Sequence, residues 1–433
     1  MSQIELHAEF CCSGAQEFPI EEKPLKDTSS VVKLLANNMD NSDQLFIIIR
    51  RGCPLRRVLE IWKREVKKDP SCLRKRVFVS YSGEHGIDSG AIANEFYNQV
   101  IPEIGTNMFP NGIPQDSTSN IQNYNFMTCG QIVASSLAQG GPPPCFLDES
   151  VFNLLVEPCL KLHEIDQFKH LTEKDRALLK SVEDDLSGNT QIVIEYGYTG
   201  PIIKKYSKQI INTMAIHIIS KRILYLKEFL EDMQPLGLAD IVQNNPNVCR
   251  ELFVAKTCTS GDVDANYVFS IMQANYSPKG SSKREVEECI MDLLQDFLFK
   301  LEDENHNTDG TEAIAYDTER ENKTQSEDED EDKDEDDPKP KVLFMKPDLT
   351  PKGVLGWLTG QKHKPLNKDE KLAVSVFFNH KCMDENPGHT ICFPYVGACG
   401  KEITLPVQHM KKAEEFNNVF FTALKKGQAF AKT

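Results

Sequence analysis

The stretch FPYVGACGKEITLP, residues 393–406, places one cysteine among small residues and follows it with an alternating apolar pattern. Cys399 is flanked by Gly397, Ala398 and Gly400, so we expect no bulky neighbour to cover its sulfur. Thiolate chemistry requires a sulfur that reactants can reach in a polar or electropositive setting. A lone cysteine is more often a buried apolar filler. The small flanking residues nevertheless make Cys399 a candidate nucleophile.

Two further motifs lie upstream of this stretch. GEHGIDSG (residues 83–90) is followed by Glu95-Phe96-Tyr97. This pattern predicts a strand, a turn with permissive glycines and a helix that begins near Ala91, which is a structural rather than a catalytic unit. The second motif, WLTG, spans residues 357–360 and is followed by Pro365.

These motifs resemble those of HECT-type ubiquitin ligases. Residues 83–97 resemble the family's Gly-Glu-x-Gly-x-Asp-x-Gly-Gly with its following Arg-Glu-Phe-Phe, and residues 357–360 look like Phe-x-Thr-Gly. Residues 393–399 align without gaps to Leu-Pro-x-x-His-Thr-Cys, and Leu405-Pro406 has the family's offset from Cys399. Phe430 is fourth from the end, where these ligases carry a functionally important phenylalanine. The sequence departs from the family pattern at four positions: Ala91, Asn94, Gly397 and Ala398.

The resemblance covers residues 44–433 apart from an acidic insert, and it implies an α+β fold. The expected architecture is a bilobal HECT-like domain, with a large, mostly helical N-lobe and a smaller α/β C-lobe joined by a short hinge. It also implies a ubiquitin-protein ligase that accepts ubiquitin from a conjugating enzyme as a thioester on Cys399 and transfers it to a substrate lysine. Thr359, Gly360 and Phe430 are the expected supporting residues, and no cofactor is implied.

Length and composition predict how the chain is divided. At 433 residues it exceeds what one hydrophobic core usually organises. We expect a poorly ordered segment at 1–43, the N-lobe at 44–276, a Pro-, Gly- and Ser-rich hinge at 277–283 and the C-lobe at 284–433. Apolar patterns predict strands at 45–49, 76–81 and 373–378, and helices around 55–62, 210–230 and 286–301.

An acidic insert, 303–341, interrupts the predicted C-lobe. Residues 302–337 contain 18 acidic side chains against three basic ones, within a chain whose net charge is -16. The few apolar side chains of this insert cannot offset the entropy that ordering would cost. We therefore expect it to be disordered. The rest of the chain is nearly neutral and shows no basic stripe, which disfavours nucleic acid as a partner.

Compartment and membrane association follow from weaker signals. No apolar run approaches the roughly 20 residues that a membrane span requires. The first residues, MSQIELHAEFCCSG, lack the pattern of a secretory signal, and the 13 cysteines show no disulfide-framework spacing. We therefore expect mostly reduced thiols, no membrane partner and a cytoplasmic or nuclear location.

Several alternatives remain at this point. Cys392 is the rival acceptor, but it lies 13 residues before Leu405, whereas Cys399 lies six before it. Catalytic weakening would leave a non-enzymatic interaction module, and a cysteine protease is disfavoured because no matching histidine and oxyanion pattern is present. Zinc binding is a further alternative, because six possible ligands crowd the C-terminal region: His380, Cys382, His389, Cys392, Cys399 and His409. The strand-like and apolar pattern of this segment favours ordinary packing, so we expect no metal site.

Overall fold

Two neighbouring parallel strands begin the fold. In the computed structural model, which describes residues 25–84, 90–157, 160–161, 165–258, 262–308, 347–385 and 387–428, β1 (Asp40–Ile49) pairs with β2 (Lys75–Tyr81). Leu45, Ile47 and Ile49 are buried while the alternate residues of β1 are exposed, as expected for a strand covered on one face. Both strands and their connecting helix were predicted from the sequence.

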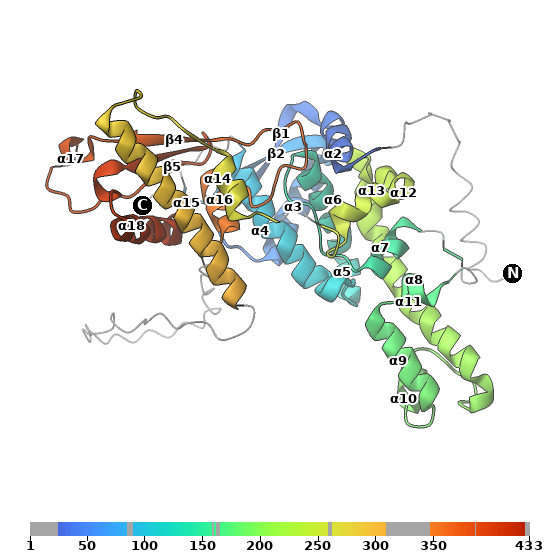
Figure 1. Ribbon diagram of the computed structural model, residues 1–433. Coiled ribbons are helices and arrows are strands. Elements are labelled where there is room, and N and C mark those ends of the chain that lie inside the picture. Colours follow the sequence, from blue (N-terminus) through green and yellow to red (C-terminus); the bar gives the residue numbers. More distant parts are fainter. Residues whose placement is uncertain are drawn as a thin grey trace, which may run out of the picture.

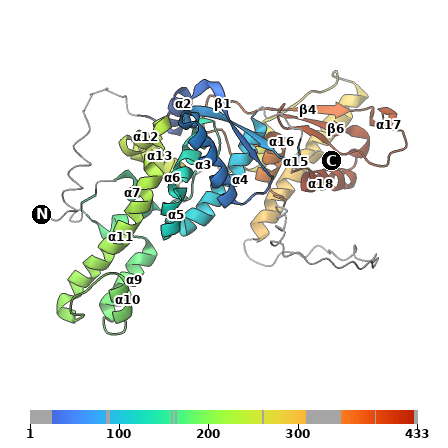
Figure 2. The ribbon, with the colours of Figure 1, turned by 180° about the vertical axis from the view of Figure 1, so that it is seen from behind.

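Helices build the first hydrophobic core around these strands. The long α11 (Ser207–Glu231) packs along α6 (Asn125–Ala138), whose side chains are almost all buried. Figures 1 and 2 show α9, α10 and the adjoining part of α11 projecting from this core as an arm. The other elements of the first core are α2 (Thr28–Asn37), α3 (Leu55–Lys68), η1 (Pro70–Arg74), α4 (Ala91–Met108), η2 (Pro110–Gly112), α5 (Thr118–Gln122), α7 (Glu149–Val156), α8 (Gln167–His170), α9 (Glu173–Asp184), α10 (Thr190–Glu195), η4 (Lys204–Tyr206), η5 (Gln234–Leu236), α12 (Leu238–Asn244) and α13 (Pro246–Phe253).

A second hydrophobic core surrounds a four-stranded sheet in the order β3-β4-β6-β5. The strands β3, β4 and β6 are parallel, and β5 is antiparallel to β6. Trp357, Phe416 and Phe420 fill the space between the helices that cover it. Its elements are α14 (Ala265–Ser270), β3 (Met272–Ala274), α15 (Ser282–Thr308), α16 (Pro351–Thr359), β4 (Val374–Asn379), α17 (Cys382–Glu385), β5 (Tyr395–Gly397), β6 (Glu402–Pro406), η6 (Val407–His409) and α18 (Ala413–Gly427).

The chain is therefore an α+β protein with two separate cores, but the predicted boundaries need correction. Residues 28–37 form α2, which buries Val31 and Leu35 in the first core. Contrary to the prediction, the segment 25–43 is therefore ordered. Residues 265–274 already belong to the second core through α14 and β3. The connection between the cores is thus 255–264, not the predicted hinge.

The predicted hinge, 277–283, is a loop attached to the start of α15. The buried Glu287 accepts hydrogen bonds from the Ser277 backbone N–H and hydroxyl, both at 2.6 Å, and pairs with His380 Nε2 at 2.6 Å. Burial alone would raise the pKa of Glu287, but these hydrogen bonds hold it below its ordinary value. The sequence pattern indicated a flexible connector because composition does not reveal that the nearby Glu287 is buried and paired with the distant His380.

Two further features concern the edges of the fold. The helix α15 continues to Thr308, six residues into the predicted insert, and the remaining insert residues lie outside the described part of the chain. One cysteine pair, Cys145–Cys258, forms a disulfide, whereas the other eight cysteines of the described residues form none, in agreement with the expectation of mainly reduced thiols. Among the described helices, none combines the length and the apolar character needed to cross a membrane.

Candidate functional site

Cys399 lies at the tip of the hairpin formed by β5 and β6. The turn is closed by a hydrogen bond from Lys401 N to Ala398 O at 3.2 Å, with Lys401 in a left-handed conformation at φ 51°. Lys401 O in turn accepts from Ser375 N of β4 at 2.9 Å, so the tip is attached to the middle of the sheet. The Cys399 side chain is exposed, as the small neighbouring residues predicted.

The hairpin tip faces the first core across a small cleft. This cavity, of about 150 Å³, lies between residues 398–401 and the beginning of α4. Arg76 and Lys401 bring positive charge to its lining, and Glu370 brings one negative charge. A thiol at this position is therefore reachable and has basic side chains close by, which suits thiolate chemistry.

Thr359 and Gly360, at the end of α16, lie where the two cores meet near this cleft. The buried Thr359 hydroxyl donates to Leu355 O at 2.8 Å and closes the end of α16. Gly360 follows at φ +75°, and Asn98 Nδ2 of α4 donates to its carbonyl oxygen at 2.7 Å. A Cβ on Gly360 would overlap the backbone of Ala91, so only glycine fits this approach. Gly360 thus connects the two cores, and Thr359 fixes the end of α16 from which Gly360 projects.

The loop after Gly360 extends this contact along the first core. Leu366 is buried within the first hydrophobic core although it follows α16 in sequence. Ser29 Oγ is within 3.3 Å of Asn367 Oδ1, and it accepts a hydrogen bond from Lys368 N at 3.1 Å. Ion pairs Lys368–Asp27 and Lys33–Asp369 lie at the margin and are largely exposed, so they contribute little.

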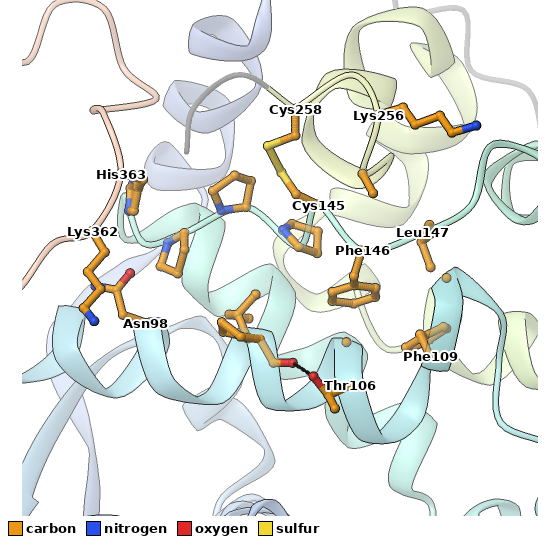
Figure 3. A pocket seen from close by; sticks show the side chains of 18 of the residues that line it. Asn98, Thr106, Phe109, Cys145, Phe146, Leu147, Lys256, Cys258, Lys362 and His363 are labelled. Atoms are coloured by element: carbon orange, nitrogen blue, oxygen red, sulfur yellow. Dashed lines mark hydrogen bonds between the residues drawn. A yellow bond between two sulfur atoms is a disulfide. The ribbon is translucent and has the colours of Figure 1, made fainter. Parts of the chain in front are cut away.

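A much larger cavity, about 1030 Å³, lies farther along α4 and is lined by residues that precede α14 and by residues that flank α16. Figure 3 shows its lining, with Asn98 and Thr106 on α4, Phe109 directly after it, the Cys145–Cys258 disulfide, and Lys362 and His363 from the loop after α16. His363 is almost completely buried and its Nε2 has no hydrogen-bond partner. Burial lowers the pKa of His363 to about 4, so the ring is neutral at pH 7.

The N-terminal motif has a structural role where it is described. Arg51 donates two hydrogen bonds of 2.8 Å to Glu84, pairs with Glu95 and stacks over the Tyr81 ring. Burial raises the pKa of Glu95 to about 7, although Arg51 opposes the shift. The predicted helix start at Ala91 is confirmed, and residues 85–89 of the motif lie outside the described residues.

The six possible zinc ligands do not all lie together, but four of them do. The donor atoms of Cys382, His389, Cys392 and His409 lie within 4.8 Å of one another. His380 pairs with Glu287 instead, and Cys399 lies on the hairpin tip facing the other core. The fold therefore brings four ligands that are separated in the sequence to one point, a juxtaposition that the sequence pattern did not predict.

Sequence reasoning missed Glu402. A Cβ at Gly397 would lie 2.9 Å from Glu402 Oε1, and one at Gly400 would lie 3.5 Å from the same atom, so both glycines leave room for this carboxylate. The pairing of Gly397 with Glu402 across the hairpin produces this arrangement. If residues 395–406 had been predicted to form a hairpin, the sequence would have placed Glu402 opposite Gly397. Phe430 lies outside the described residues.

Comparison with known proteins finds no family model that matches the chain and no curated protein that matches it. The site is therefore interpreted from its own motifs and geometry.

Proposed function

We propose that this chain is a HECT-type ubiquitin ligase whose Cys399 carries ubiquitin as a thioester. The observation that carries the proposal is the exposed Cys399 on a hairpin tip, held at a cleft between two cores and beside basic side chains. Cys129 and Cys249, by contrast, are buried, and burial raises their pKa values. The motif resemblance at 83–97, 357–360 and 393–406 gives the reaction its identity.

The chemistry is two acyl transfers. The Cys399 thiolate attacks the carbonyl carbon of the thioester between ubiquitin and a conjugating enzyme, and the enzyme's cysteine leaves as a thiolate. A neutral lysine amine of the substrate then attacks the new thioester, forming an isopeptide bond and releasing the Cys399 thiolate. The amine proton must be taken up during this step. The Glu402 carboxylate, close to the residues flanking Cys399, is our candidate acceptor for it.

The projecting arm and the neighbouring α8 supply candidate contacts for the conjugating enzyme. Phe168 is 84% exposed, and Ile194 and Ile203 are at least half exposed. Exposed large apolar side chains are candidates for contacts with another protein. Here they lie on or next to α8, α10 and η4.

Transfer between these surfaces requires the two cores to move as the lobes of a HECT domain. In this proposal the C-lobe moves about the connection between Cys258 and α14, since the disulfide ties Cys258 to the first core and 277–283 is bound to α15 through Glu287. The cavity of about 1030 Å³ beside α4 means that the cores contact each other over only part of their facing surfaces. Such motions commonly assemble catalytic sites. The cytoplasm or nucleus is the proposed location, in keeping with eight free cysteines among the described residues.

The test is a thioester assay with ubiquitin, activating enzyme and a panel of conjugating enzymes, resolved on non-reducing gels. The wild-type chain should form an adduct that thiols reverse. Cys399→Ser should abolish it or trap a thiol-resistant oxyester, whereas Cys289→Ser, which removes another exposed cysteine on α15, should leave it unchanged. A thiol-labile adduct that persists in Cys399→Ser would refute the assignment.

One observation favours the alternative of a non-enzymatic interaction module. Gly397 stands where the family pattern has a histidine. Any side chain at this position would meet Glu402, so the site differs in shape from the family pattern. A module without turnover would bind a conjugating enzyme through the arm but form no Cys399 adduct with any member of the panel. Binding lost on Phe168→Ala, without an adduct in wild type, would select this alternative.

A further inference from the structure

The loop between β4 and β5 lies outside the second hydrophobic core. Residues 380–394 separate the two strands, and none of those described belongs to the second core. Ile391 and Phe393 of this loop are both more than half exposed. A loop of this length with so few apolar contacts pays an ordering cost that something else must offset.

Four metal-binding side chains converge at the base of this loop. Cys382 begins α17, His389 and Cys392 follow in the loop, and His409 ends η6 just after β6. His389 Nε2 lies 2.9 Å from His409 Nε2 and 2.8 Å from Cys392 Sγ. Cys382 is buried and the other three are partly buried.

The donor set and its spacing fit zinc. Tetrahedral zinc binds cysteine sulfur at about 2.3 Å and histidine nitrogen at about 2.0 Å, so its donors lie roughly 3.3–3.8 Å apart. The donor atoms here lie within 4.8 Å of one another, which is within about 1 Å of that spacing. Two thiolates with two imidazoles form one of the common structural zinc sets, and two thiolates neutralise the ion's charge.

We propose that Cys382, His389, Cys392 and His409 bind one structural zinc ion. Cys392 lies three residues before β5 and His409 three residues after β6, so the ion joins the two chain segments at the open end of the β5–β6 hairpin. The opposite end of the hairpin carries Cys399. Zinc thus fixes the base from which Cys399 projects, and it occupies Cys392, the rival acceptor. This inference does not depend on the ubiquitin ligase proposal.

Metal analysis of the full chain, purified in the presence of zinc and without chelator, tests the site. The wild type should retain about one zinc per chain, as a closed four-ligand site does. Cys382→Ser and His409→Asn should lose most of it, whereas Cys289→Ser, a cysteine outside the cluster, should retain it. Cobalt substituted for zinc should give the visible absorption of a tetrahedral thiolate site in wild type.

A rescue variant separates ligation from folding. His409→Cys keeps four donors and should retain zinc, with a cobalt spectrum shifted towards a three-thiolate set. Wild-type protein without zinc and without a cobalt spectrum would overturn the proposal. So would undiminished zinc in both Cys382→Ser and His409→Asn, or a Cys382–Cys392 disulfide in a peptide map of the native chain.

Discussion

Replacing Gly360 by alanine tests whether the contact between the cores depends on a close backbone approach. Gly360 has φ +75°, and an added Cβ would lie 3.0 Å from both Ala91 C and Cα while overlapping the carbonyl oxygen. The left-handed conformation costs about 1–2 kcal/mol for alanine. Forcing a methyl group into a filled space costs about 1–3 kcal/mol more. We expect Gly360→Ala to destabilise the chain by roughly 2–5 kcal/mol.

Gly280→Ala is the matched control for this prediction. Gly280 also has positive φ, +79°, but a Cβ there would meet nothing within 4 Å. It should therefore show only the conformational cost of about 1–2 kcal/mol. The measurements are denaturant unfolding and hydrogen exchange of the peptides that contain residues 90–98 and 360–369. Faster exchange at both peptides is expected for Gly360→Ala alone, because the Asn98 hydrogen bond is lost with the contact.

Two results would refute this reasoning. Equal destabilisation by the two alanines would mean that the clash with Ala91 is relieved without cost. Unchanged exchange at residues 90–98 in Gly360→Ala would mean that this glycine does not hold the cores together.

Three other predictions concern separate features. The pKa of His363 falls to about 4 on burial from an ordinary value near 6.5, so the unfolded chain binds more protons between these values. The contribution of His363 to stability should therefore fall by about 3 kcal/mol as pH drops from 6.5 to 4, and the difference in unfolding free energy between wild type and His363→Gln should change by that amount across the range. Phe430→Ala should slow transfer to lysine more than formation of the Cys399 adduct, in single-turnover assays of each step; equal effects on both steps would contradict a positioning role. Deletion of 312–338 should leave the unfolding free energy, measured by denaturant titration, within about 1 kcal/mol of wild type, because shortening a long connection changes its closure entropy little. An unfolded product would contradict this prediction.

The sequence alone determined the local elements of this protein. Alternating Val, Phe and Tyr residues predict β2, and apolar residues at helical spacing predict α3 and α11, because strand and helix periodicity are properties of neighbouring residues. The glycine and small residues around Cys399 predicted an exposed sulfur for the same local reason. The α+β class follows from these elements together.

Only the tertiary structure decided how distant segments meet. The division between the cores at 255–264 depends on β3 pairing with β4, about a hundred residues later in the chain. The loop at 277–283 is held by Glu287 and His380, and its composition alone indicated a hinge. Cys382, His389, Cys392 and His409 converge because parallel β4 and β6 bring η6 beside the β4–β5 loop. Such contacts are set by packing across the sheet, which the local sequence pattern does not encode.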